Sequence, residues 1–193
     1  EFDGEFVTSG EKSVSLKEIA GKSTCGNNSE LQITSSYSSE ISPPPFMVGM
    51  AEVEVDKETG SVEVLDYVAV VDCGTPVNPN LARVQTEGGI AQGIGMALYE
   101  DVQYSEKGKI RNNSFMQYKI PSRQDIGKIR VEFECSYEKS GPFGAKSIGE
   151  LVIDTPCPAI ANAIHNATGL YVRELPITPE KIALGLLEKE EKT

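Results

Sequence analysis

Apolar and acidic residues alternate along residues 51–55, where Ala and Val stand between Glu residues. This period of two is typical of a β-strand with one buried and one solvated face. The segment 56–60 predicts a turn whose final glycine can take positive φ, and the alternation resumes at 62. Because residues 67–71 are continuously apolar, we expect the second strand to end buried on both faces. The pattern therefore predicts a β-hairpin.

Helical spacing of apolar residues marks three later segments. The stretch 80–100 is predicted to be helical, and so is 156–168. Thr178 as N-cap with Pro179 after it predicts the start of a third helix. Residues 129–133 alternate again and predict another strand. We therefore expect an α+β fold, with a twisted, mainly antiparallel sheet packed with about three helices.

The N-terminal residues 1–42 are rich in Ser, Gly, Lys and Glu. Ser15 followed by Glu18 is typical of a capping box and predicts a short helix that starts there. Residues 22–42 are polar and predict either an extended edge segment or a mobile linker. The chain is thus expected to consist of a polar N-terminal segment and a main domain over 43–193.

The composition is that of an ordinary globular protein and limits its partners. The chain has 193 residues, of which 39% are hydrophobic and 24% charged, enough for one domain or two small ones with a core. The net charge of −11 argues against a nucleic-acid partner, because phosphate binding draws on clustered Lys and Arg. No apolar run approaches the roughly 20 residues that span a bilayer, so no membrane partner is expected.

The cysteines and the single histidine argue against several kinds of site. Cys25, Cys73, Cys135 and Cys157 are widely spaced and form no C-x-x-C pair, which argues against zinc and iron–sulfur ligation. A disulfide scaffold is not expected in a chain of this length, so reduced cysteines favour a cytoplasmic protein. His165 alone cannot supply a His-based triad or a multi-His metal site. It lies off the apolar stripe of its helix and is predicted to be solvated.

The segment 144–150, Gly-Ala-Lys-Ser-Ile-Gly-Glu, is the strongest candidate for chemistry. Glycine lets a backbone turn sharply and approach a ligand where a β-carbon would collide, which makes Gly149 a candidate contact. Glu150 ends the loop, and a carboxylate held at such a position suits a general base. Taken alone, a simple connecting loop is the more frequent structure for such a segment.

The predicted helix at 80–100 contains glycines that would each weaken an isolated helix by about 1 kcal/mol relative to Ala. Gly89 and Gly93 lie four apart on one face. They leave two alternatives open, which are tight packing against a neighbouring element and close approach of a ligand. Gln85 lies near the start of this helix. Its amide offers one acceptor and two donors to a ligand with a mixed polar edge.

Several motifs occur in one order between about residues 43 and 187, and together they resemble the molybdenum hydroxylases, the xanthine dehydrogenase and aldehyde oxidase family. These motifs are the D-x-G-x-x-x-N-P turn at 72–79, the Q-x-E-G-G-x-x-Q-G-x-G helix at 85–95, the G-A-K-x-x-G-E loop at 144–150, a helix with its stop at 158–169 and the E-L-P-I-T-P-E segment at 174–180. Two positions depart from the family pattern. Ser147 adds a β-carbon where the loop signature has Gly, and Val84 stands where a Gly precedes the Gln.

The resemblance implies a molybdenum-pterin cofactor, with or without a cytosine dinucleotide. Glu150 would be the base beside the molybdenum, and Gln85 and Gly149 would contact the cofactor. No residue of this chain would ligate the metal. The implied reaction is hydroxylation of an electron-poor carbon with oxygen from water. Electrons would leave through iron–sulfur clusters and FAD on other domains or subunits.

The resemblance also implies that this sequence, which begins at Glu1, is the C-terminal molybdopterin-binding part of a larger molybdenum subunit and is inactive by itself. A separate small subunit is the alternative. Its partners would be the rest of the molybdenum subunit, the iron–sulfur and flavin domains or subunits, and a small-molecule substrate. A xanthine or other purine leads, with an aldehyde, nicotinate or carbon monoxide as alternatives. A non-catalytic assembly or docking domain is an alternative of another class.

Overall fold

The computed structural model describes residues 1–25, 32–36 and 38–191. The chain divides into two compact units, Glu1–Ser38 and Ser39–Thr193, and each is described by itself. The alternatives predicted for 22–42 fall partly on 26–31 and 37, which lie outside the described residues. Over the described ranges, no helix is long and apolar enough to cross a membrane.

The first unit contains a small hairpin and a helix. Strands β1 (Phe6–Ser9) and β2 (Lys12–Ser15) pair antiparallel, and α1 (Leu16–Cys25) follows directly. The Ser15 hydroxyl oxygen accepts a hydrogen bond from the Glu18 amide at 3.2 Å, which confirms the predicted N-cap. A polar segment therefore carries regular structure.

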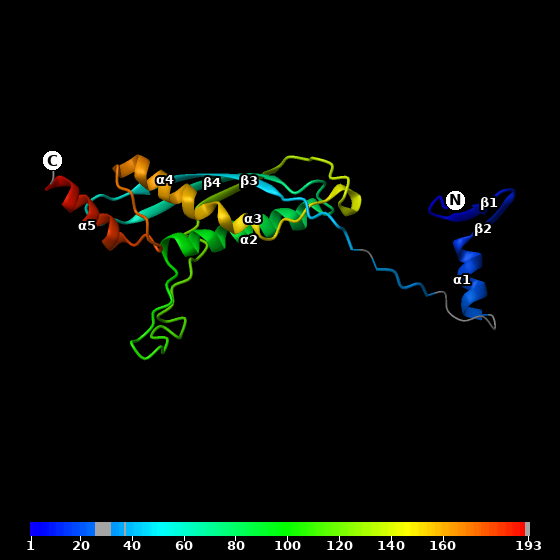
Figure 1. The fold of residues 1–193 in the computed structure, drawn as a ribbon, viewed down its shortest axis with the longest axis horizontal. Coiled ribbons are helices and arrows are strands. Elements are labelled where there is room, and N and C mark those ends of the chain that lie inside the picture. The colour runs from blue at the N-terminus through cyan, green and yellow to red at the C-terminus, as the bar shows by residue number, and fades with distance from the viewer. Residues whose placement is uncertain (26–31, 37, 192–193) are drawn as a thin grey trace. The chain divides into compact units, whose positions relative to one another are not determined.

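The second unit is built on a three-stranded sheet in the order β3-β4-β5 (Figure 1). β3 (Phe46–Val55) and β4 (Val62–Asp72) pair antiparallel and form the predicted hairpin. β5 (Lys128–Phe133) confirms the third predicted strand and lies parallel to β4. The fold is α+β with mainly antiparallel strands, and the β4–β5 pairing is the parallel exception.

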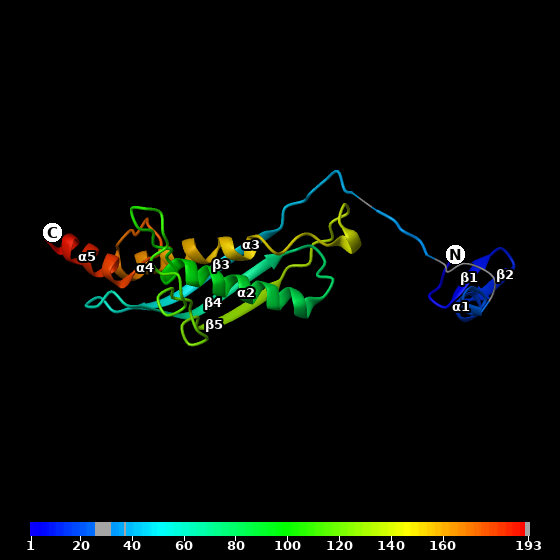
Figure 2. The same cartoon turned by 90° about the horizontal axis from the view of Figure 1, so that it is seen from below.

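Helices pack along this sheet, and one more lies beyond its end (Figure 2). Those along the sheet are α2 (Pro79–Leu98), α3 (Leu151–Asp154) and α4 (Pro156–Thr168), and the one beyond its end is α5 (Pro179–Glu190). α4 packs against β3, and α2 packs against α3, α4 and β5. The three helices expected from the apolar spacing are thus confirmed. The segment between α2 and β5 projects away from the sheet as a long loop (Figure 1).

The core of the second unit lies between the sheet and the helices α2 and α4. Its fully buried side chains come from one face of β4 and one stripe of each helix, and they include Tyr67, Ala69, Val71, Ile90, Ile94, Ile160 and Ile164. The Tyr67 hydroxyl forms a hydrogen bond with the Thr155 hydroxyl at 2.9 Å, which satisfies a polar atom in this interior.

The opposite face of the sheet is more exposed than the sequence predicts. The apolar run at 67–71 predicts burial on both faces, but Val70 is 40% exposed. Its cross-strand partner Val48 is exposed too, as are Phe46 and Met50 on the same face of β3. The prediction is wrong because, in the part of the chain that the structure describes, helices cover one face of the sheet. These four side chains form what we call the outer apolar face.

Helix packing explains the glycines of α2. A β-carbon on Gly89 would overlap Val152 of α3, and one on Gly93 would lie 2.6 Å from the Pro156 ring of α4. Real β-carbons do not come so close to other atoms, so glycine at both positions lets α2 approach the next two helices. Of the two alternatives left open for this face, the structure supports tight packing.

Candidate functional site

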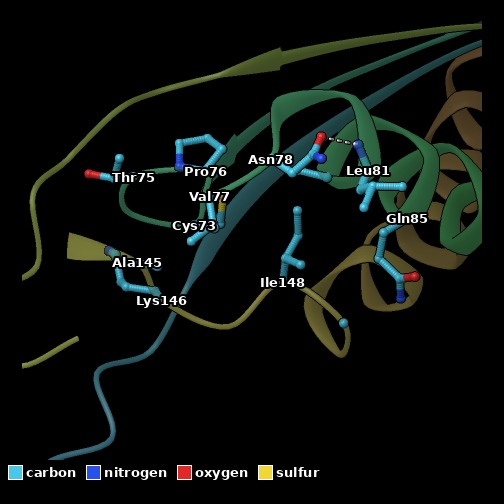
Figure 3. Close-up of a pocket in the computed structure, with 12 residues that line it drawn as sticks. Cys73, Thr75, Pro76, Val77, Asn78, Leu81, Gln85, Ala145, Lys146 and Ile148 are labelled. Atoms are coloured by element: carbon cyan, nitrogen blue, oxygen red, sulfur yellow. Dashed lines mark hydrogen bonds between the residues drawn. The ribbon is translucent and has the colours of Figure 1, made fainter. Parts of the chain in front are cut away.

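A pocket of about 450 Å³ lies where the end of β4, the start of α2 and the loop before α3 meet (Figure 3). Its lining residues are Cys73, Thr75, Pro76, Val77, Asn78, Leu81, Ala82, Gln85, Ala145, Lys146, Ile148 and Gly149. Ile148 points from the loop toward the start of α2, between Asn78 and Gln85 (Figure 3). Two segments that are far apart in the sequence therefore share one cavity.

Backbone hydrogen bonds join these two segments. The Thr75 amide donates to the Gly144 carbonyl at 2.8 Å, and the Lys146 amide donates to the Cys73 carbonyl at 2.7 Å. Gly74, between them, has a φ of 68°, and a β-carbon there would overlap the Gly144 carbonyl oxygen. Position 74 needs glycine both for this left-handed conformation and for the close approach of the two backbone segments.

The first turn of α2 forms another wall of the pocket. Asn78 is its N-cap, and the side-chain oxygen of Asn78 accepts the Leu81 amide at 3.1 Å. Pro79 follows at the start of the helix, where its missing N–H costs nothing. The helix dipole at this end favours a ligand with acceptor oxygens or negative charge.

A largely buried ion pair supports the joint between the two segments. The Lys146 ammonium lies 2.7 Å from the Asp72 carboxylate, and the two side chains are 7% and 21% exposed. The same carboxylate accepts the Ser136 hydroxyl at 2.6 Å and the Gly74 amide at 2.9 Å. These partners, the Lys146 ammonium foremost, lower the pKa of Asp72 from 3.8 to about 2.

The low pKa of Asp72 predicts a pH-dependent contribution to stability. A pKa of about 2 in the folded protein against 3.8 is worth about 2 kcal/mol at neutral pH. This contribution is complete above the ordinary pKa and is lost as the pH falls through the folded-state value. The unfolding free energies of the protein and its Asp72→Asn variant should therefore converge by about that amount between roughly pH 5 and 2. Urea unfolding at a series of pH values measures this, and a constant difference would contradict it.

The structure brings two of the three predicted site residues into the pocket lining. Gln85 and Gly149 both line it, and a β-carbon on Gly149 would lie 3.8 Å from the Gln85 amide nitrogen. Glu150 follows Gly149 directly and immediately precedes α3. Its side chain is exposed and is not part of the lining. The geometry thus joins Gln85 to the loop and leaves Glu150 next to the pocket.

Sequence reasoning missed the ion pair between Asp72 and Lys146 and assigned no role to the pocket residues Cys73 and Asn78. A signal for the ion pair is present in the sequence. Asp72 ends an apolar strand, and Lys146 stands among small residues in a loop. A charge in either setting needs a partner if it is buried, although the sequence does not say which partner.

His165 is not the solvated side chain that the helical pattern predicts. Its ring stacks on Tyr171 with the centroids 3.7 Å apart. Its Nδ1 atom is buried and has no hydrogen-bond partner among the described residues. The prediction is wrong because the segment that follows α4 folds back over the ring. The pattern within a single helix carries no information about such a contact.

The pocket lining suits the polar atoms of an organic ligand. Over the described ranges, no group of three or more His, Cys, Asp or Glu could hold a metal ion. The lining instead offers the Gln85 amide, the backbone of the loop up to Gly149 and the start of α2, all suited to polar atoms of an organic ring or its substituents. A pterin that holds molybdenum through its own dithiolene fits this donor set.

Comparison with known proteins identifies the family. The model of the molybdopterin cofactor-binding domain matches residues 1–127. The probable hypoxanthine oxidase of Escherichia coli K12 is 40% identical over 178 residues, which cover 91% of this chain and 18% of that protein. The aldehyde oxidoreductase molybdenum-binding subunit of the same organism is 35% identical over 184 residues, which cover 93% of this chain and 25% of that subunit.

A solved structure shares the fold. The CO dehydrogenase from Oligotropha carboxidovorans matches with a TM-score of 0.81 and 24% identity, over 100% of this chain and 25% of that chain. The chain thus spans a quarter or less of the length of the proteins it matches. Because the family model matches more than half of its residues, the chain belongs to the molybdopterin cofactor-binding domain family.

Proposed function

We propose that this chain is the C-terminal molybdopterin-binding part of the molybdenum subunit of a hydroxylase of the xanthine dehydrogenase type. The observation that carries the proposal is the pocket shared by Gln85 of α2 and Gly149 of the loop. A pterin has donors and acceptors along its edge, which match the Gln85 amide and the backbone of the loop. The proposed cofactor carries a cytosine dinucleotide or lacks one.

Three residues of the chain have distinct roles in this proposal. When bound, the cofactor supplies the oxidising metal centre. Gln85 holds the cofactor edge through its amide, and Gly149 leaves room for the cofactor because it has no side chain. Glu150 is the general base, whose carboxylate accepts a proton as a water-derived oxygen adds to an electron-poor carbon of the substrate.

A xanthine or other purine is the proposed substrate class. A relative at 40% identity is named a probable hypoxanthine oxidase, and one at 35% is an aldehyde oxidoreductase subunit. An aldehyde, nicotinate or carbon monoxide is the alternative substrate for the same chemistry. Electrons would pass to iron–sulfur clusters and FAD on partner domains or subunits. The cytoplasm is the proposed compartment, in keeping with the four free cysteines.

A non-catalytic assembly domain is the second candidate, and the outer apolar face favours it. Phe46, Val48, Met50 and Val70 expose a contiguous set of apolar side chains on one side of the sheet. Such a set is typical of a surface that packs against another domain or subunit. Molybdenum content separates the two candidates, because an assembly domain has no need of the pocket.

The pocket assignment predicts the effect of changing Gln85 in the complete molybdenum subunit. Gln85→Ala is expected to lower the molybdenum and pterin content per protein about tenfold, because loss of one hydrogen-bonded contact weakens binding by about 1.4 kcal/mol. Metal analysis by mass spectrometry and fluorescence of the released pterin measure this. The released material also shows whether a cytosine nucleotide is attached.

Gln92→Ala is the matched control. Gln92 lies in the same helix and is exposed, but it does not line the pocket. Its substitution should leave the molybdenum content unchanged. Equal contents in the Gln85 variant and the unmodified protein would refute the cofactor contact. Unmodified protein without molybdenum would refute the hydroxylase proposal and favour the assembly domain.

A further inference from the structure

We infer that Lys146, paired with Asp72, is a positioning residue that holds the loop bearing Gly149 and Glu150 in register with the pocket. The inference rests on the proposed function, because it concerns the placement of the proposed base. Neither side chain is offered as a catalytic residue.

Lys146 is held at both of its ends. Its backbone amide donates to the Cys73 carbonyl at 2.7 Å, and its ammonium lies 2.7 Å from the Asp72 carboxylate. The ammonium also lies 5.2 Å from the centroid of the Phe46 ring, which favours the cation further. A lysine side chain that is only 7% exposed is rare unless it is paired. The loop is thus fixed to β4 by both main chain and side chain.

Asp72 joins several segments at one carboxylate. It ends β4, and it accepts the hydroxyl of Ser136 in the segment after β5 and the amide of Gly74 in the pocket turn. Since Lys146 is its other partner, the Asp72 carboxylate connects the end of β4 with the segment after β5, with the turn that contains Gly74 and with the loop that contains Lys146. Hydrogen bonds to an ionised oxygen are shorter and stronger than neutral ones. The carboxylate therefore sets the positions of these segments relative to one another.

Burial of its cation distinguishes this ion pair from the others that the structure describes. Lys146 is 7% exposed, whereas Arg130 in the pair with Asp66 is 51% exposed, and Lys22 in the pair with Glu18 is exposed as well. Exposed ion pairs contribute little, because water screens them and the long side chains lose entropy. Removing one partner of a buried pair leaves a charge without compensation. The Asp72–Lys146 pair is therefore the one whose loss should move the backbone.

A displacement of Lys146 would also displace the proposed base, Glu150, because the two residues are close in the sequence. Three residues separate Lys146 from Glu150, and Ile148 among them packs against the hydrophobic core. Gly149, the last of the three, offers the chain conformational freedom. The loop is thus held at Lys146 and at Ile148. A misplacement of about 1 Å in a reacting group can cost 10²-fold in rate.

The test uses the complete enzyme with its cofactor. Lys146→Met and Asp72→Asn are each expected to lower kcat, expressed per bound molybdenum, about 100-fold, while KM changes less than about threefold. Lys146→Arg keeps the cation and should restore most of the lost kcat. Ser136→Ala leaves the ion pair in place and should cost only a few-fold.

Hydrogen exchange supplies a readout that does not depend on turnover. The amides at positions 145 and 146, which donate to the Pro142 and Cys73 carbonyls, are expected to exchange at least about tenfold faster in the Lys146→Met enzyme. Exchange in the sheet should be unchanged, and Lys146→Arg should restore the protection. Arg130→Met is the matched control, since it breaks an ion pair on the same sheet whose cation is 51% exposed. Its kcat and its exchange at positions 145 and 146 should not change.

Several outcomes would overturn the inference. These are an unchanged kcat in both loss variants, an equal loss in the Arg130→Met control, or no rescue by Lys146→Arg. If the Lys146→Met enzyme does not accumulate in cells, the Ser136→Ala and Lys146→Arg enzymes provide the test. A large loss of kcat in both, with unchanged hydrogen exchange in the loop, would refute the positioning role. Failure of the base assignment is recognised separately, by a Glu150→Gln enzyme that keeps its activity, and failure of the proposed function by unmodified protein without molybdenum. Faster exchange in Lys146→Met would still show that the ion pair holds the loop.

Discussion

Replacement of Glu150 by Gln in the complete molybdenum subunit is expected to abolish turnover while molybdenum stays bound. Gln has nearly the same shape as Glu but cannot accept a proton at neutral pH. General-base catalysis contributes about 10²–10⁴-fold in rate, and kcat should fall by at least that factor. Gln85 and the Gly149 backbone are unchanged in this variant, so the cofactor contacts should remain. Steady-state kinetics with metal analysis of the same preparation measure both quantities.

Asp154→Asn is the matched control for that experiment. Asp154 lies at the end of α3, four residues beyond Glu150, and its side chain is also exposed. Its neutralisation changes the local charge by the same amount and should leave kcat within a few-fold. A Glu150→Gln enzyme with substantial residual activity would refute the base assignment. An equal loss in both variants would point to local charge instead of proton transfer.

The second large effect is expected from a substitution far from the proposed chemistry. Gly93→Val should lower the free energy of unfolding by about 3 kcal/mol, because a β-carbon alone would already lie 2.6 Å from the buried Pro156 ring. The proline ring is rigid and cannot turn away. For a protein of this size, the loss corresponds to a drop of about 6–12 °C in the thermal unfolding midpoint.

Gly88→Val separates packing from helix propensity. Gly88 lies in the same helix, but a β-carbon there would have no atom within 4 Å. Valine is a slightly better helix former than glycine, so this variant should be equal to the unmodified protein or more stable by a few tenths of a kcal/mol. Similar destabilisation in both variants would show that the close packing of α2 on α4 is not what requires glycine at 93.

Local patterns in the sequence account for most of the elements. The hairpin, the three main helices and the N-caps at Ser15 and Thr178 depend on residues within a few positions of one another, which is the range over which periodicity and capping act. The parallel pairing of β4 with β5 was not predicted. It joins Asp66 to Lys128 across α2 and the long loop that follows it, and no short-range signal encodes that register.

In the candidate site, too, local sequence motifs predict some features, and long-range contacts that they do not predict determine the others. The motifs pointed to Gln85 and Gly149, and the structure places both in one pocket. The Asp72–Lys146 pair joins residues 74 positions apart, and the covering of His165 by Tyr171 depends on a returning loop. Val70 shows a limit of the apolar pattern itself. An apolar run does not tell whether other parts of the same chain cover both faces of a strand or leave one face exposed.

Because the pocket is built from two segments that are far apart in the sequence, it can form only after both have been synthesised. A ribosome that adds about 5–20 residues per second would need roughly 4–15 s to synthesise the 74 positions from Asp72 to Lys146. During that interval β4 already presents its apolar inner face, while the loop that completes the pocket and the helices α3 and α4 do not yet exist. A nascent chain therefore cannot hold a ligand of this pocket, and capture has to follow synthesis of most of the domain.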